Sequence, residues 1–217
     1  MACFWFCAVH TIYQRFILWA FDRLYHEFAW SYDIVAAAVS RGYWPRWIGA
    51  AIPLLGGGPI LELGCGTGYL QAALAQATIP HAGLDASPQM LRRAARRLAR
   101  AGLPRHLMQG RAEALPFPAE TFSDVVATFP APYIVQPATL AEVCRVLRSN
   151  GQLLIVDGGQ LDGGMYRAAV ELAYRTSLQA DEMDRYTPVL EAAGLAVRTQ
   201  RVRVGGSSVG IISAQQA

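Results

Sequence analysis

Short apolar runs alternate along this chain with longer segments in which apolar residues recur at helical spacing. An apolar run of about four to eight residues between turn residues is typical of a strand buried on both faces, as in a parallel sheet. We predict such strands at Ile60–Leu63, His81–Asp85, Arg105–Gly110, Phe122–Phe129 and Gln152–Asp157. We predict helices at Tyr69–Ala77, Pro88–Ala101, Pro137–Leu147, Met165–Leu178 and Asp181–Ala193. This alternation favours an α/β fold with helices on both faces of the sheet.

Turn residues divide the C-terminal third. Asn150-Gly151 predicts the end of the preceding helix, and glycine pairs bracket a predicted flexible loop over 158–164. Two strand patterns, Leu195–Val204 and Val209–Ala214, flank Gly205-Gly206, which predicts an antiparallel hairpin. The expected sheet therefore has seven strands, most of them parallel, with the hairpin at one edge.

The N-terminal region has a pattern of its own. Apolar residues recur at helical spacing at Trp5, Val9, Ile12, Phe16 and Trp19. His10, Gln14 and Arg15 interrupt this helix well before the ~20 apolar residues that a membrane span needs. It either packs on the domain as a cap, which we favour, or lies at a bilayer surface or forms the wall of an apolar pocket. We therefore divide the chain into an N-terminal helical cap segment, residues 1–55, and a main domain, residues 56–217.

Composition narrows the chemistry. The sequence contains no lysine, so Schiff-base and lysine-base catalysis are excluded. The net charge of +3 is too small to indicate nucleic-acid binding. The arginines at 92–100 are interpreted as a solvated helix face, because no aromatic platform or second basic element accompanies them.

Cysteine usage indicates the compartment. Cys3, Cys7, Cys65 and Cys144 show no C-x-x-C spacing, so we expect neither a disulfide framework nor a metal site. A reducing cytoplasm fits best. No basic segment precedes the apolar N-terminal residues, and a secretory signal is not expected. We predict a cytoplasmic protein, with membrane-surface contact through the N-terminal helix as an open alternative.

A glycine turn, Gly64-Cys65-Gly66-Thr67-Gly68, joins the first strand to a helix. Glycines at such a crossover let the backbone approach a nucleotide ligand closely. The spacing is G-x-G-x-G, whereas the dinucleotide fingerprint is G-x-G-x-x-G. Glu62 precedes the turn and no Lys or Arg lies within it, so a pyrophosphate would be repelled and a ligand with an ammonium group attracted. A turn that only packs helix on strand would not explain Glu62.

Asp85 is the candidate ribose-binding acid. It ends the second predicted strand seventeen positions after Gly68 (85 − 68), near the ~20 positions expected in a nucleotide-binding crossover. A carboxylate can accept hydrogen bonds from both ribose hydroxyls. Ser87-Pro88 supplies the helix cap and first-turn proline, so we expect Asp85 to be free for the ligand.

At Glu62–Gly68 the sequence E-L-G-C-G-T-G resembles the first motif of the class I S-adenosylmethionine-dependent methyltransferases. The segment Gly110–Phe117 resembles their third motif, and Glu142–Leu153 looks like the corresponding helix, turn and strand. The resemblance covers about residues 58–160 and implies a Rossmann-like sheet with S-adenosylmethionine as cofactor. Residues 32–33, Tyr-Asp, resemble the entry segment of the ubiquinone/menaquinone-biosynthesis type, which implies that Tyr32 lies over the cofactor. Alternatively, Tyr32 only marks a helix boundary.

Arg111 departs from the family motif, which has an acid at this position. In the family that acid commonly accepts a hydrogen bond from the adenine amino group. Arg111 therefore either weakens cofactor binding or turns outward. The backbone N–H of Ala112 remains able to contact the adenine. The cofactor-binding residues implied are Tyr32, Glu62, Gly64, Cys65, Gly66, Gly68, Asp85, Ala86, Met90, Arg111, Ala112 and Phe129.

The acceptor side is less defined. Ligands in open α/β sheets lie beyond the carboxyl ends of the strands, so Phe129–Tyr133 should face the transferred methyl. This segment only faintly echoes an N/D-P-P-Y motif, and we do not infer a nitrogen acceptor from it. Several residues could approach the site, namely His10, His26, Tyr133, Tyr166 and Tyr186, but none is assigned as a catalytic base.

We predict a methyltransferase that acts on a small apolar or aromatic acceptor, such as a quinone precursor or a lipid. A lipid or amine N-methyltransferase stays open as an alternative within the family. Two rivals come from other classes: a protein that binds S-adenosylmethionine without turnover, and a nicotinamide oxidoreductase, against which the spacing of the glycine turn argues. Oligomeric state is not predicted.

Overall fold

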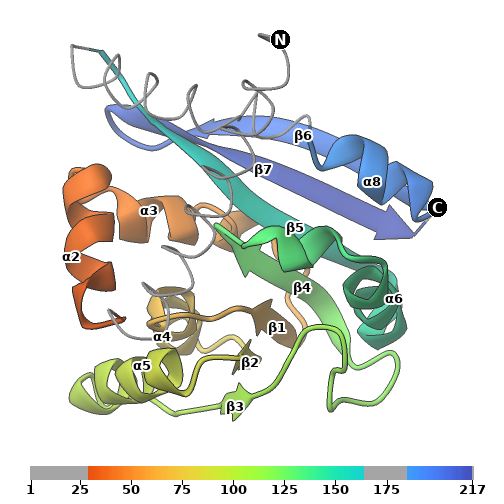
Figure 1. Cartoon of the computed structure of the whole chain (residues 1–217), viewed down its shortest axis with the longest axis horizontal. Helices are drawn as coiled ribbons and strands as arrows, with labels where there is room; N and C mark the ends of the chain where they lie inside the picture. The colour runs from red at the N-terminus through yellow and green to blue at the C-terminus, as the bar shows by residue number, and fades with distance from the viewer. Residues whose placement is uncertain (1–28, 164–184, 217) are drawn as a thin grey trace, which may run out of the picture.

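The computed structural model describes residues 29–163 and 185–216. The predicted N-terminal aromatic helix and the helix at 165–178 lie outside these residues. The strands are β1 Ile60–Leu63, β2 His81–Asp85, β3 Leu107–Gln109, β4 Phe122–Thr128, β5 Leu147–Leu161, β6 Leu195–Arg203 and β7 Ser207–Gln216 (Figure 1). The helical elements are α2 Ala29–Val39, α3 Trp44–Gly49, η1 Ile52–Leu54, α4 Tyr69–Gln76, α5 Pro88–Arg100, η2 Pro132–Val135, α6 Pro137–Val146 and α8 Thr187–Ala192.

The sheet has the predicted class. Its strand order is β3-β2-β1-β4-β5-β7-β6. The first five strands in this order pair in parallel, and β7 pairs antiparallel with both β5 and β6. The α/β prediction of seven mostly parallel strands with a C-terminal hairpin is therefore confirmed. The order reverses beside β1, and such a switch point is where open α/β sheets bind ligands.

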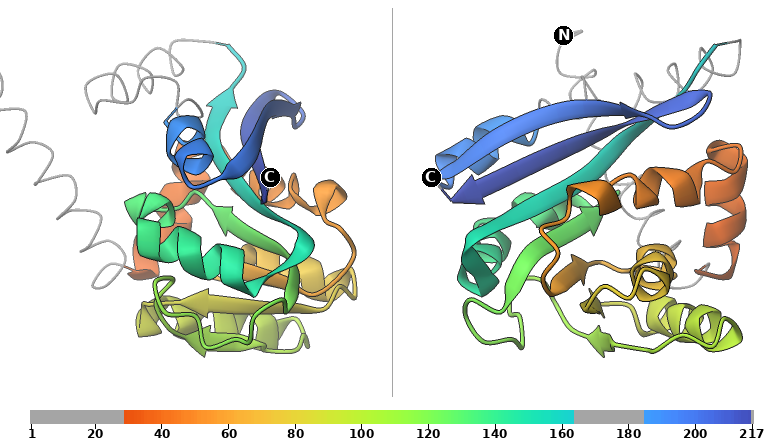
Figure 2. Two further views of the ribbon diagram at one scale, coloured as in Figure 1. Left: turned by 90° about the vertical axis from the view of Figure 1, so that its right-hand side faces the viewer. Right: turned by 180° about the vertical axis from the view of Figure 1, so that it is seen from behind.

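The strand β5, predicted at Gln152–Asp157, is longer than predicted at both ends. This strand begins at Leu147, directly after α6, and runs beyond the parallel strands beside β7 (Figure 2). Asn150-Gly151 lies within it, where the register against β4 shifts between Phe122 and Asp124. A Cβ on Gly151 would lie 2.9 Å from the carbonyl oxygen of Ser123, so glycine allows this irregularity. Residues 158–161, expected in a loop, belong to β5: Gln160 and Leu161 pair with β7, and residues 158 and 159 lie in an irregularity of the ladder before them.

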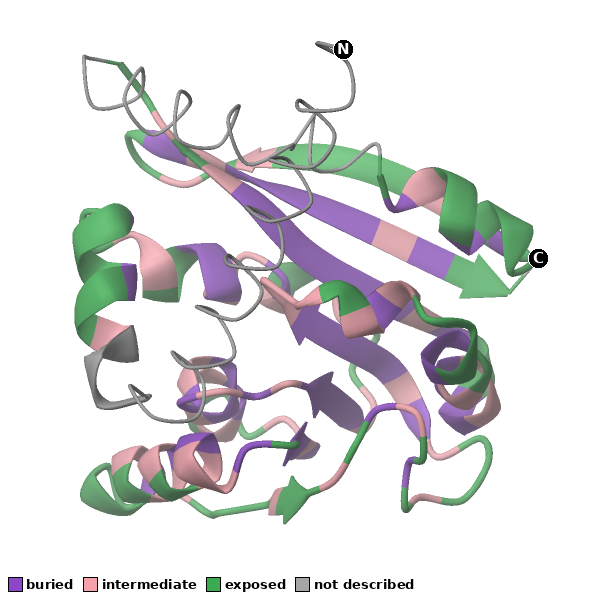
Figure 3. Cartoon of the chain, in the orientation of Figure 1, coloured by how far each residue is buried: buried purple, intermediate pink, exposed green. Residues whose placement is uncertain are grey.

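Two hydrophobic clusters fill the two faces of the sheet. One includes residues of η2, α6 and α8, and the other includes Trp47 and Ile48 of α3 and the leucines of α4. The central strands are buried, whereas β6 at the edge is largely exposed (Figure 3). Trp47 lies in the same cluster as Ile60 of β1. The division of the chain after residue 55 stays a prediction.

The N-terminal and C-terminal parts of the described chain meet at α3. Trp47 Nε1 donates a hydrogen bond to Ser207 Oγ at 3.0 Å. The N–H of Gly206 donates to the hydroxyl of Tyr43 at 3.2 Å. The β6–β7 turn is therefore fastened to the start of α3. Across the residues described, no helix has both the length and the hydropathy of a membrane span.

Candidate cofactor and acceptor site

The glycine turn after β1 has a backbone that only glycine adopts readily. Gly64, Gly66 and Gly68 have φ of +67°, +51° and +81°, in the left-handed region that side chains disfavour. The N–H of Gly64 donates to the carbonyl of Leu84 at 2.8 Å, which fixes the turn to the end of β2. A Cβ on Gly64 would collide with the hydroxyl of Tyr133. A Cβ on Gly68 would lie 2.9 Å from the Cβ of Ala94 in α5, so the missing side chains let Tyr133 and α5 pack closely against the turn.

Glu62 is a buried carboxyl at the base of this turn. It is 1% exposed and accepts hydrogen bonds from Gln71 Nε2 at 2.8 Å and from Thr128 Oγ1 at 3.4 Å. Burial raises the pKa of Glu62 to about 8, although these hydrogen bonds lower it. No arginine pairs with Glu62 anywhere in the described chain. Burial therefore favours the neutral form of this acid, and a neighbouring cation would favour the charged form.

Asp85 lies at the end of β2, but it is not free as predicted. Its Oδ2 accepts from the N–H of Gly66 and its Oδ1 from the N–H of Ser87, both at 2.8 Å. Ser87 caps α5 as expected, with its hydroxyl accepting from the N–H of Met90 at 3.3 Å. Ser87 therefore caps α5, while Asp85 connects the glycine turn to the start of α5 through the N–H groups of Gly66 and Ser87. A carboxylate oxygen can accept more than one hydrogen bond, so a ribose contact is compatible with these bonds.

A pocket with about 280 Å³ of space, partly open to solvent, lies over the turn. Its lining comes from three places: the glycine turn with Tyr69, the strand residues Glu62 and Thr128, and Trp44 with Ile48 of α3. Trp44 stacks on Phe129 with ring centroids 4.2 Å apart, and Trp47 lies 6.1 Å from the same ring. One wall of the pocket is therefore aromatic. Sequence analysis placed Phe129 near the site but did not single out the aromatic residues at 43–47.

Phe129 holds an unusual backbone conformation at the end of β4. Its φ is +47°, a region that costs a non-glycine residue about 1–2 kcal/mol. Its N–H donates to the carbonyl of Val156 at 2.7 Å, and its ring is stacked on Trp44. These contacts hold the strained residue where the chain leaves the sheet toward η2.

The segment after β3 carries Arg111 on its outer side. The Arg111 side chain is 75% exposed and pairs with Glu113 at 3.1 Å. Of the two alternatives for Arg111, the structure has the outward-turned one. Ala112 beside it is buried.

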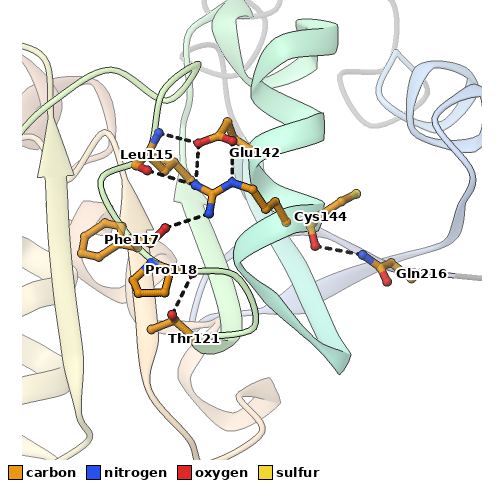
Figure 4. Close-up of polar contacts among 8 residues, drawn as sticks. Leu115, Phe117, Pro118, Thr121, Glu142, Cys144 and Gln216 are labelled. Carbon is orange, nitrogen blue, oxygen red and sulfur yellow. Dashed lines mark hydrogen bonds and ion pairs between the residues drawn. The ribbon is translucent and has the colours of Figure 1, made fainter.

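The rest of this segment is held by contacts with α6, and Figure 4 shows Leu115 and Phe117 of the segment facing Glu142 of that helix. Arg145 donates to the carbonyls of Leu115 and Phe117 at 3.0 and 2.8 Å and pairs with Glu142 at 2.7 Å. Glu142 in turn accepts from the N–H of Leu115 at 2.6 Å. Sequence reasoning noted these residues as part of a family motif, but not what they contact.

The predicted cofactor residues fall into two groups. Glu62, Gly64, Cys65 and Gly66 line the pocket together, Gly68 begins α4 beside it, and Phe129 backs its aromatic wall. The remaining described residues are not part of its lining: Asp85, Ala86, Met90, Arg111 and Ala112. Burial raises the pKa of the Cys65 thiol well above its usual range, so this cysteine is not a nucleophile. The side chain of Tyr32 lies outside the described part, but Asp33 next to it contacts the turn, as described below.

Of the residues considered as acid or base, two are described. The Tyr133 hydroxyl lies against Gly64. Tyr186 is buried and donates to Asp157 Oδ2 at 2.5 Å, while Arg185 binds the same oxygen at 2.8 Å. That cluster joins the segment before α8 to β5. His10, His26 and Tyr166 lie outside the described residues.

Comparison with known proteins identifies the family. Residues 60–151 match the model of a methyltransferase domain. Over 157 residues the chain is 38% identical to phosphatidylethanolamine N-methyltransferase of Cereibacter sphaeroides, covering 71% of this chain and 75% of that one. It is 35% identical over 158 residues to a ubiquinone/menaquinone biosynthesis C-methyltransferase of Syntrophotalea carbinolica, covering 68% and 65% respectively.

The structural comparison agrees at the level of the fold. A structure of geranyl diphosphate methyltransferase in complex with S-adenosylmethionine matches with a TM-score of 0.58 at 14% identity, over 80% of this chain and 85% of that one. The fold and the relatives together define a methyltransferase. The chain belongs to the class I S-adenosylmethionine-dependent methyltransferases, and the predicted family and cofactor are confirmed.

Proposed function

We propose that this enzyme transfers the methyl group of S-adenosylmethionine to a small acceptor with an apolar or aromatic body. The observation that carries the proposal is the stacked pair Trp44–Phe129 beside the pocket that Glu62 lines. Aromatic rings provide apolar area and directional stacking for a flat or greasy acceptor. The cap segment, residues 1–55, contributes to this wall through Trp44 and Ile48 of α3.

The pocket fits the cofactor on chemical grounds. Glu62 is a buried acid with no cationic partner among the described residues, and we propose that it holds the methionine ammonium directly or through water. At Gly66 a Cβ would have only the carbonyl oxygen of Gly64 within 4 Å, at 3.9 Å, and we propose that the cofactor lies against the backbone there. We assign the ribose to Asp85 and propose that the Arg111 side chain takes no part.

The sulfonium of the bound cofactor supplies an electrophilic methyl group for an in-line displacement. The chain itself has to orient the acceptor and keep water out. Trp44, Ile48 and Phe129 fit that task because they are apolar and held by stacking and burial. No general base is assigned, which suits an acceptor that is already nucleophilic.

A lipid amine is the second candidate for the acceptor. Its support is the 38% identity to a phosphatidylethanolamine N-methyltransferase. The quinone C-methyltransferase relative supports the aromatic acceptor instead. Both acceptors combine an apolar body with a nucleophilic atom, so the aromatic wall alone does not separate them.

An acceptor screen tests the proposal. Purified protein would be incubated with S-adenosylmethionine and either detergent-dispersed phosphatidylethanolamine, a reduced demethylated naphthoquinone or a simple phenol, and S-adenosylhomocysteine release would be measured. We expect turnover with at least one of the first two and a matching methylated product by mass spectrometry. Cofactor binding with no turnover on any of them would favour the cofactor-binding alternative, and no cofactor binding would overturn the site assignment.

A further inference from the structure

A single carboxylate on α2 contacts the cofactor side of the site. Asp33 Oδ1 accepts a hydrogen bond from Thr67 Oγ1 at 2.7 Å. Its Oδ2 pairs with Arg97 of α5 at 2.9 Å and lies 3.8 Å from Arg93. Asp33 thus joins three segments: α2, the glycine turn and α5.

Arg97 completes the cluster from the other side. It donates to the backbone carbonyl of Thr67, and its guanidinium lies 3.7 Å from the centroid of the Tyr69 ring. Thr67 is 3% exposed, and both Thr67 and Tyr69 line the pocket. These contacts hold the last residues of the turn where α4 begins.

A second contact joins α2 to the aromatic wall. Ser40, fully buried just after α2, accepts a hydrogen bond at its Oγ from the N–H of Trp44 at 3.1 Å. Asp33 of α2 therefore contacts the glycine turn, and Ser40, just after α2, contacts the backbone of Trp44 in the aromatic wall.

The turn needs external support because of its composition. Three of its five residues are glycines with positive φ, and glycine has the most conformational freedom to lose on ordering. Ordering a flexible turn on binding costs free energy and lowers the affinity for the ligand. A turn that is already fixed in the bound conformation avoids this cost, so the ligand binds it more tightly. The contacts of Asp33 with Thr67 and Arg97 fix the turn from outside.

We propose that Asp33 is a positioning residue for the cofactor: it fixes the Thr67–Gly68 end of the turn, so that docking of α2 and cofactor binding strengthen each other. Coupling between two sites is reciprocal, and the cofactor must therefore stabilise α2 as much as α2 stabilises the bound cofactor. This inference rests on the proposed cofactor site at the glycine turn.

Affinity measurements on three variants test the contact. Calorimetry should show that Asp33→Asn and Thr67→Val each weaken S-adenosylmethionine binding about tenfold, the size expected for losing a hydrogen bond to a charged group. The double variant should lose less affinity than the sum of the two single losses, because both changes weaken the same Asp33–Thr67 hydrogen bond, whereas only Asp33→Asn also weakens the ion pair with Arg97. Thr67→Ser, which keeps the hydroxyl, should recover most of the affinity. Val35→Ala, on the exposed side of α2, is the matched control and should bind like wild type.

Two further measurements separate positioning from general stability. In the Asp33 variant the KM for S-adenosylmethionine should rise about tenfold, while kcat at saturating cofactor changes less than about twofold. In hydrogen exchange, the cofactor should protect the amides of 33–40 in wild type but not in Asp33→Asn.

Unchanged affinity in both single variants, additive losses in the double variant, or no protection of α2 on binding would overturn the inference. A wild-type protein that does not bind the cofactor would overturn the proposed site instead.

Discussion

The site has a polar half and an aromatic half, and they are held together differently. In the polar half, made by the glycine turn with Glu62 and Asp85, the side chains bind one another and the backbone through directed hydrogen bonds. In the aromatic half, made by Trp44, Ile48 and Phe129, the contacts are stacking and burial. Directed bonds fail when one atom changes, whereas apolar packing tolerates substitutions of similar volume. The polar half should therefore be intolerant of change, and the aromatic half adjustable.

The largest expected effect is at Glu62. Glu62→Gln keeps the shape but removes the charge, and we expect S-adenosylmethionine to bind about 100-fold more weakly at pH 8, as for loss of a charged hydrogen bond in a buried site. Calorimetry measures this, with the exposed Glu120→Gln as control. A change of threefold or less would remove Glu62 from the cofactor site.

Gly64→Ala should be next, with affinity reduced about thirtyfold. It forces alanine to a φ of +67° and puts a Cβ against the Tyr133 hydroxyl, and the backbone strain alone costs about 1–2 kcal/mol. Gly57→Ala is the control, because Gly57 has a φ of +79° with nothing within 4 Å of a Cβ. Both variants should melt at lower temperature, but only Gly64→Ala should lose cofactor affinity. An equal loss in both would mean that the close approach at Gly64 is irrelevant.

The affinity for S-adenosylmethionine should depend on pH, by up to about tenfold per pH unit. The pKa of Glu62 is raised to about 8, so the free protein holds a proton there at pH 7 that a bound ammonium would displace. Affinity should rise with pH between about 6 and 7.5 and level off above 8. Calorimetry in buffers of different ionisation enthalpy should show release of close to one proton, and Glu62→Gln should abolish it.

The same pKa has the opposite consequence for stability. The folded protein binds this proton more tightly than the unfolded chain, in which the pKa of a glutamate takes its ordinary value of 4.5. Glu62 therefore contributes stability that is fully present below pH 4.5 and is lost as the pH rises toward 8. The melting temperature of cofactor-free Glu62→Gln should exceed that of wild type at pH 8. The difference in melting temperature should shrink as the pH falls toward 5. Thermal melts at several pH values measure this difference, and one that grows as the pH falls would contradict the prediction.

In the aromatic half, Trp44→Leu should raise the acceptor KM about fivefold, within the range for losing aromatic stacking. It should leave the affinity for S-adenosylmethionine within about twofold, which calorimetry checks against the acceptor kinetics. A Trp44→Leu protein that loses the cofactor instead would show that the two halves are not separate.

The smallest effect is expected at Arg111. Its side chain is exposed and paired only with Glu113 among the contacts described for it, and such surface pairs contribute about 0–1 kcal/mol. Arg111→Ala should change the cofactor affinity less than about twofold, and Arg111→Asp serves as the companion variant. A gain of tenfold with Asp would mean that the adenine lies within reach of this position after all.

The sequence predicted the polar half better because short-range patterns determine it. The strand at 60–63, the glycine turn and the acid at 85 follow one another along the chain, and the structure keeps them adjacent. The fold class followed from the same alternation of strands and helices. The hairpin was also predictable, since Gly205-Gly206 is a local turn signal.

What sequence reasoning missed depends on contacts between distant segments. Asp33 and Thr67 are 34 positions apart, and nothing in either segment indicates that they bind. The length of β5 depends on a partner, β7, that appears only from residue 207. Asp85 was expected to be free for the ligand, but one of its oxygens accepts a hydrogen bond from the N–H of Gly66, nineteen positions earlier.

The bond from Trp47 to Ser207 spans 160 positions of sequence. During synthesis the ribosome makes α3 long before it makes Ser207, so the support of Trp47 behind the pocket wall has to wait for β7. A nascent chain stalled before residue 207 would have every element of the polar half and yet lack the brace behind its tryptophans. We therefore expect this brace to form only after the chain has been made beyond residue 207.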